Sequence, residues 1–226
     1  MTKPIRIDFV SDVSCPWCVI GLKGLEEALD RVGGLVAADI HFQPFELNPQ
    51  MPHEGQKLTD YAAQRYGSTP QQLDERRAAI RERAADLGFR IALSPTDGRV
   101  YNTFDAHRLL HWARLEGRQR ELKLALFEAY FTSCLNPAEH DVLVDAAEQA
   151  GLDRTAAAEV LESGRYAEEV RTAESFWQSK GITGVPAIVI DQRYLISGGQ
   201  PADAFEEAIR KIAADIREPA TAGPAA

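Results

Sequence analysis

Two cysteines, Cys15 and Cys18, lie three residues apart in the segment DVSCPWCVIG, and their spacing suits them to chemistry. A thiolate rather than a thiol is the nucleophile, and free N–H groups and the dipole at a helix N-terminus stabilise a thiolate. A second cysteine three residues later lies one turn away on the same face, where it can attack a mixed disulfide. The spacing therefore favours a redox pair, with Cys15 as the exposed nucleophile and Cys18 as the more buried resolving thiol.

Two other interpretations of the pair must be weighed. A Cys-x-x-Cys segment is also half of a zinc site, which normally needs four ligands. His107 and His111 are spaced four apart, as ligands on a helix could be, but they lie much farther from the cysteines than in a zinc finger. An inert buried pair is the third interpretation, and Pro16 with Trp17 between the cysteines argues against it because they fill a core poorly. We therefore expect no metal site.

The segments around the pair predict the elements that a redox site requires. Ile5, Ile7 and Phe9 alternate with polar residues, which predicts a strand running into the cysteines. The segment after them, up to Gly33, predicts a helix with Pro16 at its first position, where proline is favoured.

The rest of the chain predicts a block of helices between two mixed segments. The expected elements are a strand at 36–45, helices between 57 and 164, a helix at 166–181, strands at 186–190 and 193–197, and a helix at 201–217.

Together the elements predict an α/β chain. Residues 1–56 and 165–218 would share one mixed sheet, and residues 57–164 would be an inserted helical domain. Residues 219–226 show no periodicity and are expected to be a disordered tail.

Composition and charge exclude several partners. The chain of 226 residues has a formal net charge of −9 and a pI near 5.1, without a Lys/Arg cluster, so nucleic acid and anionic membranes are not expected. It contains no run of eighteen apolar residues and no apolar segment typical of a secretory signal near its start. The expected compartment is therefore the cytoplasm.

Five segments resemble the DsbA-like thioredoxin superfamily, and the resemblance covers nearly the whole chain, from residue 5 to about 215. The nearer resemblance is to its cytoplasmic FrnE-like branch, grouped with 2-hydroxychromene-2-carboxylate isomerases and kappa-class glutathione transferases. The resemblance implies a thioredoxin fold with a large α-helical insertion. The segments are DVSCPWCVIG, PFELNP, NTFDAHRL, the AYF of FEAYFTS, and GITGVPAIVIDQRYLISGGQ.

The resemblance also implies a set of substrate-binding residues. The bond between Val185 and Pro186 is expected to be cis and to lie beside the cysteines, where the backbone pairs with an extended substrate or with glutathione. His107 would either act on substrate or thiolate, or hold the seam between the two parts of the chain. The substrate-binding positions are Pro16, Trp17, Phe45, Asn48, Asn102, His107, Val185 and Pro186.

Two residues outside this set carry further expectations. Asn102 is predicted to be the N-cap of the helix at 102–117, with Asp105 three residues later as in a capping box. Cys134 falls on one helical stripe with Phe127 and Phe131, so a buried, inert thiol is favoured. A second redox role or an intermolecular disulfide is the other interpretation of Cys134.

Three functions are compatible with these patterns. The first is a thiol–disulfide oxidoreductase acting on a disulfide- or thiol-containing protein or small molecule, with no required cofactor and with glutathione as a candidate co-substrate. The alternative is a glutathione-dependent isomerase or transferase, although such relatives usually carry serine at the position of Cys15. The third is a chaperone that holds extended polypeptide. The substrate and the oligomeric state stay open.

Overall fold

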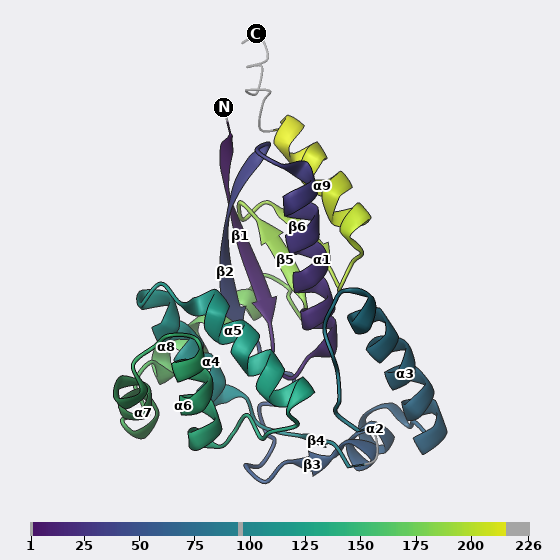
Figure 1. Ribbon diagram of the computed structural model, residues 1–226, viewed down its shortest axis with the longest axis vertical. Helices are drawn as coiled ribbons and strands as arrows, with labels where there is room; N and C mark the ends of the chain where they lie inside the picture. Colours follow the sequence, from purple (N-terminus) through teal and green to yellow (C-terminus); the bar gives the residue numbers. More distant parts are fainter. Residues whose placement is uncertain (1, 95–96, 216–226) are drawn as a thin grey trace.

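The computed structural model describes residues 2–94 and 97–215, and the predicted tail at 219–226 lies outside them. Within these ranges, strands from both ends of the chain form one sheet in the order β2-β1-β5-β6 (Figure 1). β1 runs parallel to β2 and antiparallel to β5, and the two strands predicted near the C-terminus, β5 and β6, pair antiparallel as a hairpin. The strands are β1 (Lys3–Ser11), β2 (Val36–Pro44), β5 (Ala187–Ile190) and β6 (Tyr194–Ser197).

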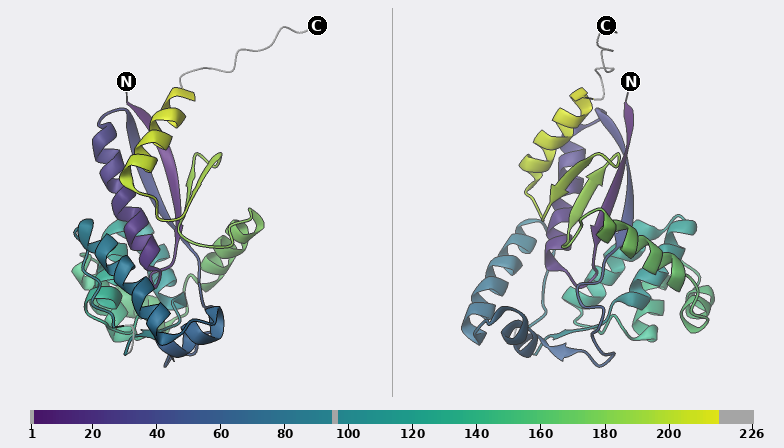
Figure 2. Two further views of the ribbon diagram at one scale, coloured as in Figure 1. Left: turned by 90° about the vertical axis from the view of Figure 1, so that its right-hand side faces the viewer. Right: turned by 180° about the vertical axis from the view of Figure 1, so that it is seen from behind.

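Side chains of β1 alternate between the two faces of this sheet and pack against different helices on each face. Ile7 and Phe9 are buried against helices α1 (Pro16–Val32) and α9 (Ala202–Asp215), which lie side by side on one face (Figures 1 and 2). On the other face Val10 packs against Trp177 of α8 (Ala167–Ser179). The predicted mixed sheet with covering helices is therefore confirmed.

The helices between β2 and α8 gather at one end of the sheet (Figure 1). Helices α4 to α7 share a hydrophobic core of their own, whereas α2 and α3 lie on the other side of α1. The elements are β3 (Gln56–Lys57), α2 (Leu58–Tyr66), α3 (Pro70–Asp86), β4 (Arg99–Val100), α4 (Phe104–Leu115), α5 (Gln119–Phe127), the π-helix η1 (Glu128–Thr132), α6 (His140–Gln149) and α7 (Arg154–Glu162). In the described part of the chain, no helix has both the length and the hydropathy needed to span a membrane.

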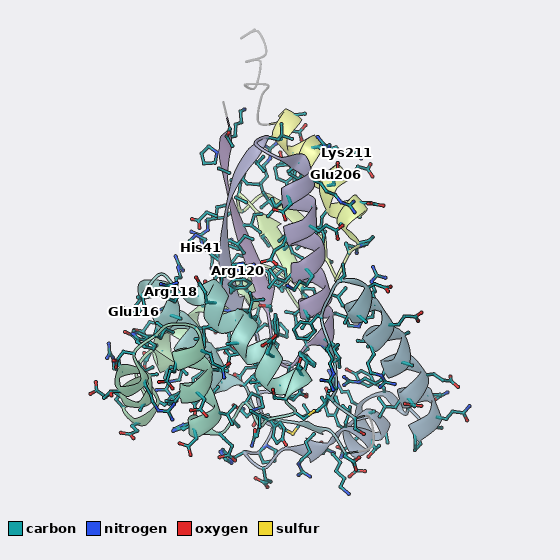
Figure 3. All side chains as sticks on the ribbon, in the orientation of Figure 1. His41, Glu116, Arg118, Arg120, Glu206 and Lys211 are labelled. Atoms are coloured by element: carbon teal, nitrogen blue, oxygen red, sulfur yellow. The ribbon has the colours of Figure 1, made fainter. Side chains whose placement is uncertain are left out.

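The helical block and the sheet are joined by shared packing. Phe127, Tyr130 and Phe131, from α5 and η1, belong to the same core as β1 and α1. On the surface, Arg120 of α5, labelled in Figure 3, donates to Glu26 of α1 at 2.7 Å. The end of β1 and the start of α1 therefore lie at the seam between the two parts.

The structure corrects the predicted start of α4. The helix begins at Phe104 with Thr103 at the N-cap, and Thr103 makes no side-chain capping bond. Asn102 lies one residue earlier, and its Oδ1 accepts from the N–H of Phe104 at 2.9 Å. Asparagine thus forms a local turn that leads into the helix rather than capping it. Asp105 pairs with Arg108 at 2.6 Å instead of completing a capping box.

The prediction of a buried Cys134 is wrong. η1 ends at Thr132, and Cys134 is exposed with φ 58°, in the left-handed region. The prediction that Cys134 shares a helical stripe with Phe127 and Phe131 required the helix to continue for another turn. Because the chain turns away first, Cys134 points out of the core that Phe127 and Phe131 fill.

Candidate active site

The first turn of α1 presents the cysteine pair at the end of β1. Cys15 is the N-cap, with an extended backbone at φ −91° and ψ 112°, and Pro16 opens the helix as predicted. The N–H of Cys15 donates to the carbonyl of Asp12 at 3.3 Å, which closes the turn leaving the strand. The N–H of Cys18 then donates to the carbonyl of Cys15 at 3.0 Å. Cys15 therefore lies at a helix N-terminus, where thiolates are stabilised.

Both cysteines are free and buried, which corrects the expectation of an exposed Cys15. Cys15 is 4% exposed and Cys18 is 0% exposed. Cys15 Sγ donates to the carbonyl oxygen of Val185 at 3.6 Å, and the Val185–Pro186 bond is cis. The segment before Pro186 thus covers Cys15, although Cys15 still lines an open cleft and Cys18 does not.

The cleft beside Cys15 has a volume of about 330 Å³. Five residues singled out in the sequence line it, namely Cys15, Pro16, Trp17, Asn48 and Val185. Polar lining residues outside the predicted substrate-binding set include Tyr61, Arg76, Arg77 and Tyr130.

Four of the predicted substrate-binding residues lie outside the cleft lining. Phe45 packs beneath β1 with Val10 and Trp177, and Pro186 faces Gly21 of α1, where an added Cβ would lie 3.1 Å from its Cγ. The other two are Asn102 and His107.

Asn102 and His107 each support the site from behind. Asn102 Nδ2 donates to Glu46 Oε2 at 3.3 Å and to the carbonyl of Pro49 at 3.4 Å, so it holds the loop that carries Asn48 into the cleft. His107 is 2% exposed and lies in the seam, with its Nε2 3.9 Å from Asp12 Oδ1.

A cluster of buried ionisable groups lies behind Cys18. The Asp12 carboxylate accepts from the N–H groups of Ser14 at 3.0 Å and Leu47 at 2.7 Å, which ties the cysteine turn to the cleft loop. Lys123 of α5 is 0% exposed, and its Nζ lies 4.9 Å from the centre of the Phe127 ring. The helical block thus supplies a cation to the region of the cysteine pair.

Burial shifts the pKa values of this cluster. It raises the pKa of Cys18 well above its ordinary value, and the neighbouring Cys15 adds to this while Lys123 opposes it. Burial lowers the pKa of Lys123 to about 8, against the opposing effect of Cys18 and Asp12. It lowers the pKa of His107 to about 4, partly offset by Asp12. At neutral pH His107 is therefore neutral, and Lys123 is the cation that favours a Cys18 thiolate.

Lys123 and His107 also line a second cavity, of about 90 Å³, which shares no lining residue with the cleft. His107 Nε2 and Lys123 Nζ have no hydrogen-bond partner among the described residues, and a cavity of this size can hold water. His111 lines the cavity too, and its ring stacks on Tyr166 at 5.0 Å, as suits a structural residue. Within residues 2–94 and 97–215, no three His, Cys, Asp or Glu side chains form a group that could hold a metal ion.

Sequence reasoning missed Asp12, Lys123 and Arg77. Lys123 has a recognisable signal, because it is a single cation on the buried stripe of α5 that also carries Phe127. Asp12 lies three residues before Cys15, but its buried position depends on Leu47 from another segment. Arg77 is one of several arginines on a charged helix, so nothing local distinguishes it.

The first turn of α1 packs closely against a glycine after β6. A Cβ added at Gly199 would lie 2.7 Å from the carbonyl oxygen of Trp17, closer than such atoms approach. We expect Gly199→Ala to lower the free energy of unfolding by roughly 2 kcal/mol. Urea unfolding would measure the loss, with Gly184→Ala as the control because no atom of the described residues lies within 4 Å of a Cβ added there. Equal stability of the two variants would contradict this close packing.

These features define a thioredoxin-fold protein with a Cys-x-x-Cys pair at the start of α1, a neighbouring cis-proline and a helical block between β2 and α8. Residues 6–210 match the family model of the DSBA-like thioredoxin domain, and the chain belongs to this family. The fold expected from the resemblance is confirmed.

Several solved structures are similar to this chain in fold. A probable DsbA oxidoreductase from Streptomyces coelicolor is similar with a TM-score of 0.84 and 31% identity, over 98% of this chain and 94% of that one. A 2-hydroxychromene-2-carboxylate isomerase shares the fold with a TM-score of 0.70 and 16% identity, over 94% and 98% of the two chains. The cytosolic disulfide reductase DsbM from Pseudomonas aeruginosa shares it with a TM-score of 0.62 and 18% identity, over the same shares.

Proposed function

We propose that the protein is a cytoplasmic thiol–disulfide oxidoreductase in which Cys15 is the nucleophile and Cys18 the resolving thiol. One arrangement carries the proposal: Cys15 lies at the N-terminus of α1 and lines the cleft, with its Sγ 3.6 Å from the Val185 carbonyl, while Cys18 lies buried one turn behind it. A substrate that enters the cleft can reach Cys15 but not Cys18. The buried Cys18 thiol lies beside Cys15, where it can react with a mixed disulfide on Cys15.

In the reducing direction, the Cys15 thiolate attacks one sulfur of a substrate disulfide, and the other substrate sulfur leaves as a thiolate. Cys18 then loses its proton and attacks Cys15 Sγ, which breaks the mixed disulfide and releases the second substrate thiolate. The Cys15–Cys18 disulfide forms and the substrate gains two electrons. The reverse sequence oxidises a substrate dithiol, and the reduction potential decides the direction.

The surroundings of the pair support distinct roles for the two thiols. Burial raises the pKa of Cys18, so this thiol holds its proton until the mixed disulfide has formed. Lys123 opposes that rise and favours the Cys18 thiolate needed in the second step. Asp12 holds both the cysteine turn and the cleft loop in place.

Glutathione is the co-substrate that we propose for regenerating the dithiol. The fold neighbour DsbM is a cytosolic disulfide reductase, and its structure has also been solved with GSH. In this chain the backbone before Pro186 lies beside Cys15, where an extended peptide can pair with it.

A glutathione-dependent isomerase or transferase is the second candidate. The likeness in fold to 2-hydroxychromene-2-carboxylate isomerase favours it. The intact Cys15–Cys18 pair weighs against it, because such a reaction needs no resolving thiol behind the first.

The reduction potential of the pair tests the proposal. The protein would be equilibrated with mixtures of reduced and oxidised glutathione, quenched, and alkylated to count free thiols. We expect a reversible two-electron transition between roughly −270 and −120 mV, the range between thioredoxin and DsbA. If no Cys15–Cys18 disulfide forms at any ratio, the oxidoreductase proposal fails and the isomerase becomes the better candidate.

A further inference from the structure

Arg77 of α3 is a cation in the cleft wall that forms no ion pair with any residue that the structure describes. Its Nη1 atom is buried and forms no hydrogen bond within the described residues. The neighbouring Arg76, in contrast, donates to Ser68 Oγ at 3.1 Å. Burial lowers the pKa of Arg77 from its ordinary value, but a guanidinium stays charged in proteins. A partly buried charge is costly unless an opposite charge joins it, so this position favours an anion.

The charge of the cleft differs from that of the whole chain. The net charge of the protein is −9, yet the described residues that line the cleft include Arg76 and Arg77 and no acidic residue. A third arginine of α3, Arg83, has its guanidinium carbon 5.8 Å from the centre of the Trp17 ring. Trp17 is one of the two residues between the cysteines. The wall of the cleft that α3 supplies is therefore basic, which attracts anions to the cleft.

We propose that the cleft takes thiols or disulfides that carry a carboxylate, and that the guanidinium of Arg77 binds this carboxylate while the reacting sulfur lies at Cys15. The inference rests on the proposed exchange reaction and names the substrate class of that site. The planar guanidinium matches the geometry of a carboxylate. Tyr61, Tyr130 and the apolar Leu58 also line the cleft and would contact the rest of the substrate.

A competing role for Arg77 is to stabilise the Cys15 thiolate directly, since the two groups attract each other. The two roles differ in what they do to an incoming reagent. Thiolate stabilisation changes the reaction of Cys15 with every reagent alike, whereas a carboxylate site favours the anionic one.

Alkylation of the reduced 226-residue chain separates these roles. Iodoacetate and iodoacetamide have similar size and differ in charge, and the exposed Cys134 provides an internal reference. Mass spectrometry would follow each cysteine. We expect the iodoacetate-to-iodoacetamide rate ratio at Cys15 to exceed that at Cys134 by about fivefold or more, and to fall as salt screens the charge.

Variants on α3 complete the test. Arg77→Gln is expected to bring the ratio at Cys15 to within about twofold of that at Cys134, and Arg77→Lys to keep most of the preference. Arg81→Gln is the matched control, because Arg81 lies on the same helix outside the cleft lining and pairs with Asp74 at 3.7 Å. Should Arg77→Gln fail to fold, Arg77→Lys and the salt dependence of the wild type decide.

Two outcomes would overturn the inference. One is an equal ratio at Cys15 and Cys134 in the wild type. The other is an Arg77→Gln variant in which both reagents slow together at Cys15, which would assign Arg77 to the thiolate. The proposed function fails separately: a chain that keeps the anion preference but forms no Cys15–Cys18 disulfide would contradict the oxidoreductase and leave the carboxylate site standing.

Discussion

The Cys18→Ser variant is expected to lose catalytic turnover by at least ~100-fold and to accumulate a mixed disulfide between Cys15 and its substrate. Cys15 lines the cleft and can still attack, but no thiol then lies behind it to release the product. Incubation with a disulfide, followed by intact-mass spectrometry under non-reducing conditions, would show the adduct. Turnover would be followed with excess reductant.

Two other serine variants are the controls for Cys18→Ser. Cys15→Ser removes the nucleophile, so it should lose turnover without forming the adduct. Cys134→Ser should behave as the wild type, because Cys134 is exposed and lies outside the cleft lining. An adduct that forms on Cys134 instead, or a Cys18→Ser variant that turns over normally, would remove Cys18 from the reaction.

The second large effect concerns Lys123 and pH. Relative to Lys123→Met, the wild-type protein is expected to gain roughly 3 kcal/mol of unfolding free energy between pH 7 and pH 10.5. The pKa of Lys123 is about 8 in the folded state and near 10.5 when unfolded. Between these values the unfolded chain binds more protons, so stability rises with pH. Methionine lacks this titration and fits the apolar surroundings.

Urea unfolding of both proteins at intervals from pH 7 to pH 10.5 would measure this difference. Lys211→Met is the matched control: Lys211 is 72% exposed on α9 and pairs with Glu207 (Figure 3). Its difference from the wild type should stay nearly constant over this range. If the Lys123→Met difference is equally flat, Lys123 titrates as an ordinary surface lysine and the buried cation described here is wrong.

The sequence was most informative where structure depends on local patterns. The alternation in β1, the CPWC segment and the proline opening α1 predicted a strand, a cysteine pair and a helix, because hydrophobic periodicity and proline geometry act over a few residues. The error at Asn102 is a shift of one residue at a helix start, and the error at Cys134 arises because its helix ends about a turn early; local turns decide both boundaries.

The surroundings of the cysteines could not be predicted in the same way. Lys123 and Arg77 reach the site from α5 and α3, and only the packing of α5 against β2 and α4, and of α3 against α1, determines which of their side chains point inward. The resemblance placed Phe45 and His107 near the cleft, and both lie behind it, since the loop between β2 and β3 carries Asn48 into the wall instead.

The pairing of β1 with β5 bears on how the chain is made. Ile7 pairs with Ile190, so β1 is synthesised early but can pair with β5 only after most of the chain has been made. Contacts of such sequence separation form late, since a long loop must close first. The Val185 carbonyl that covers Cys15 belongs to the same late segment. The reactive thiols are thus among the first residues to leave the ribosome, and the segment that covers Cys15 is among the last.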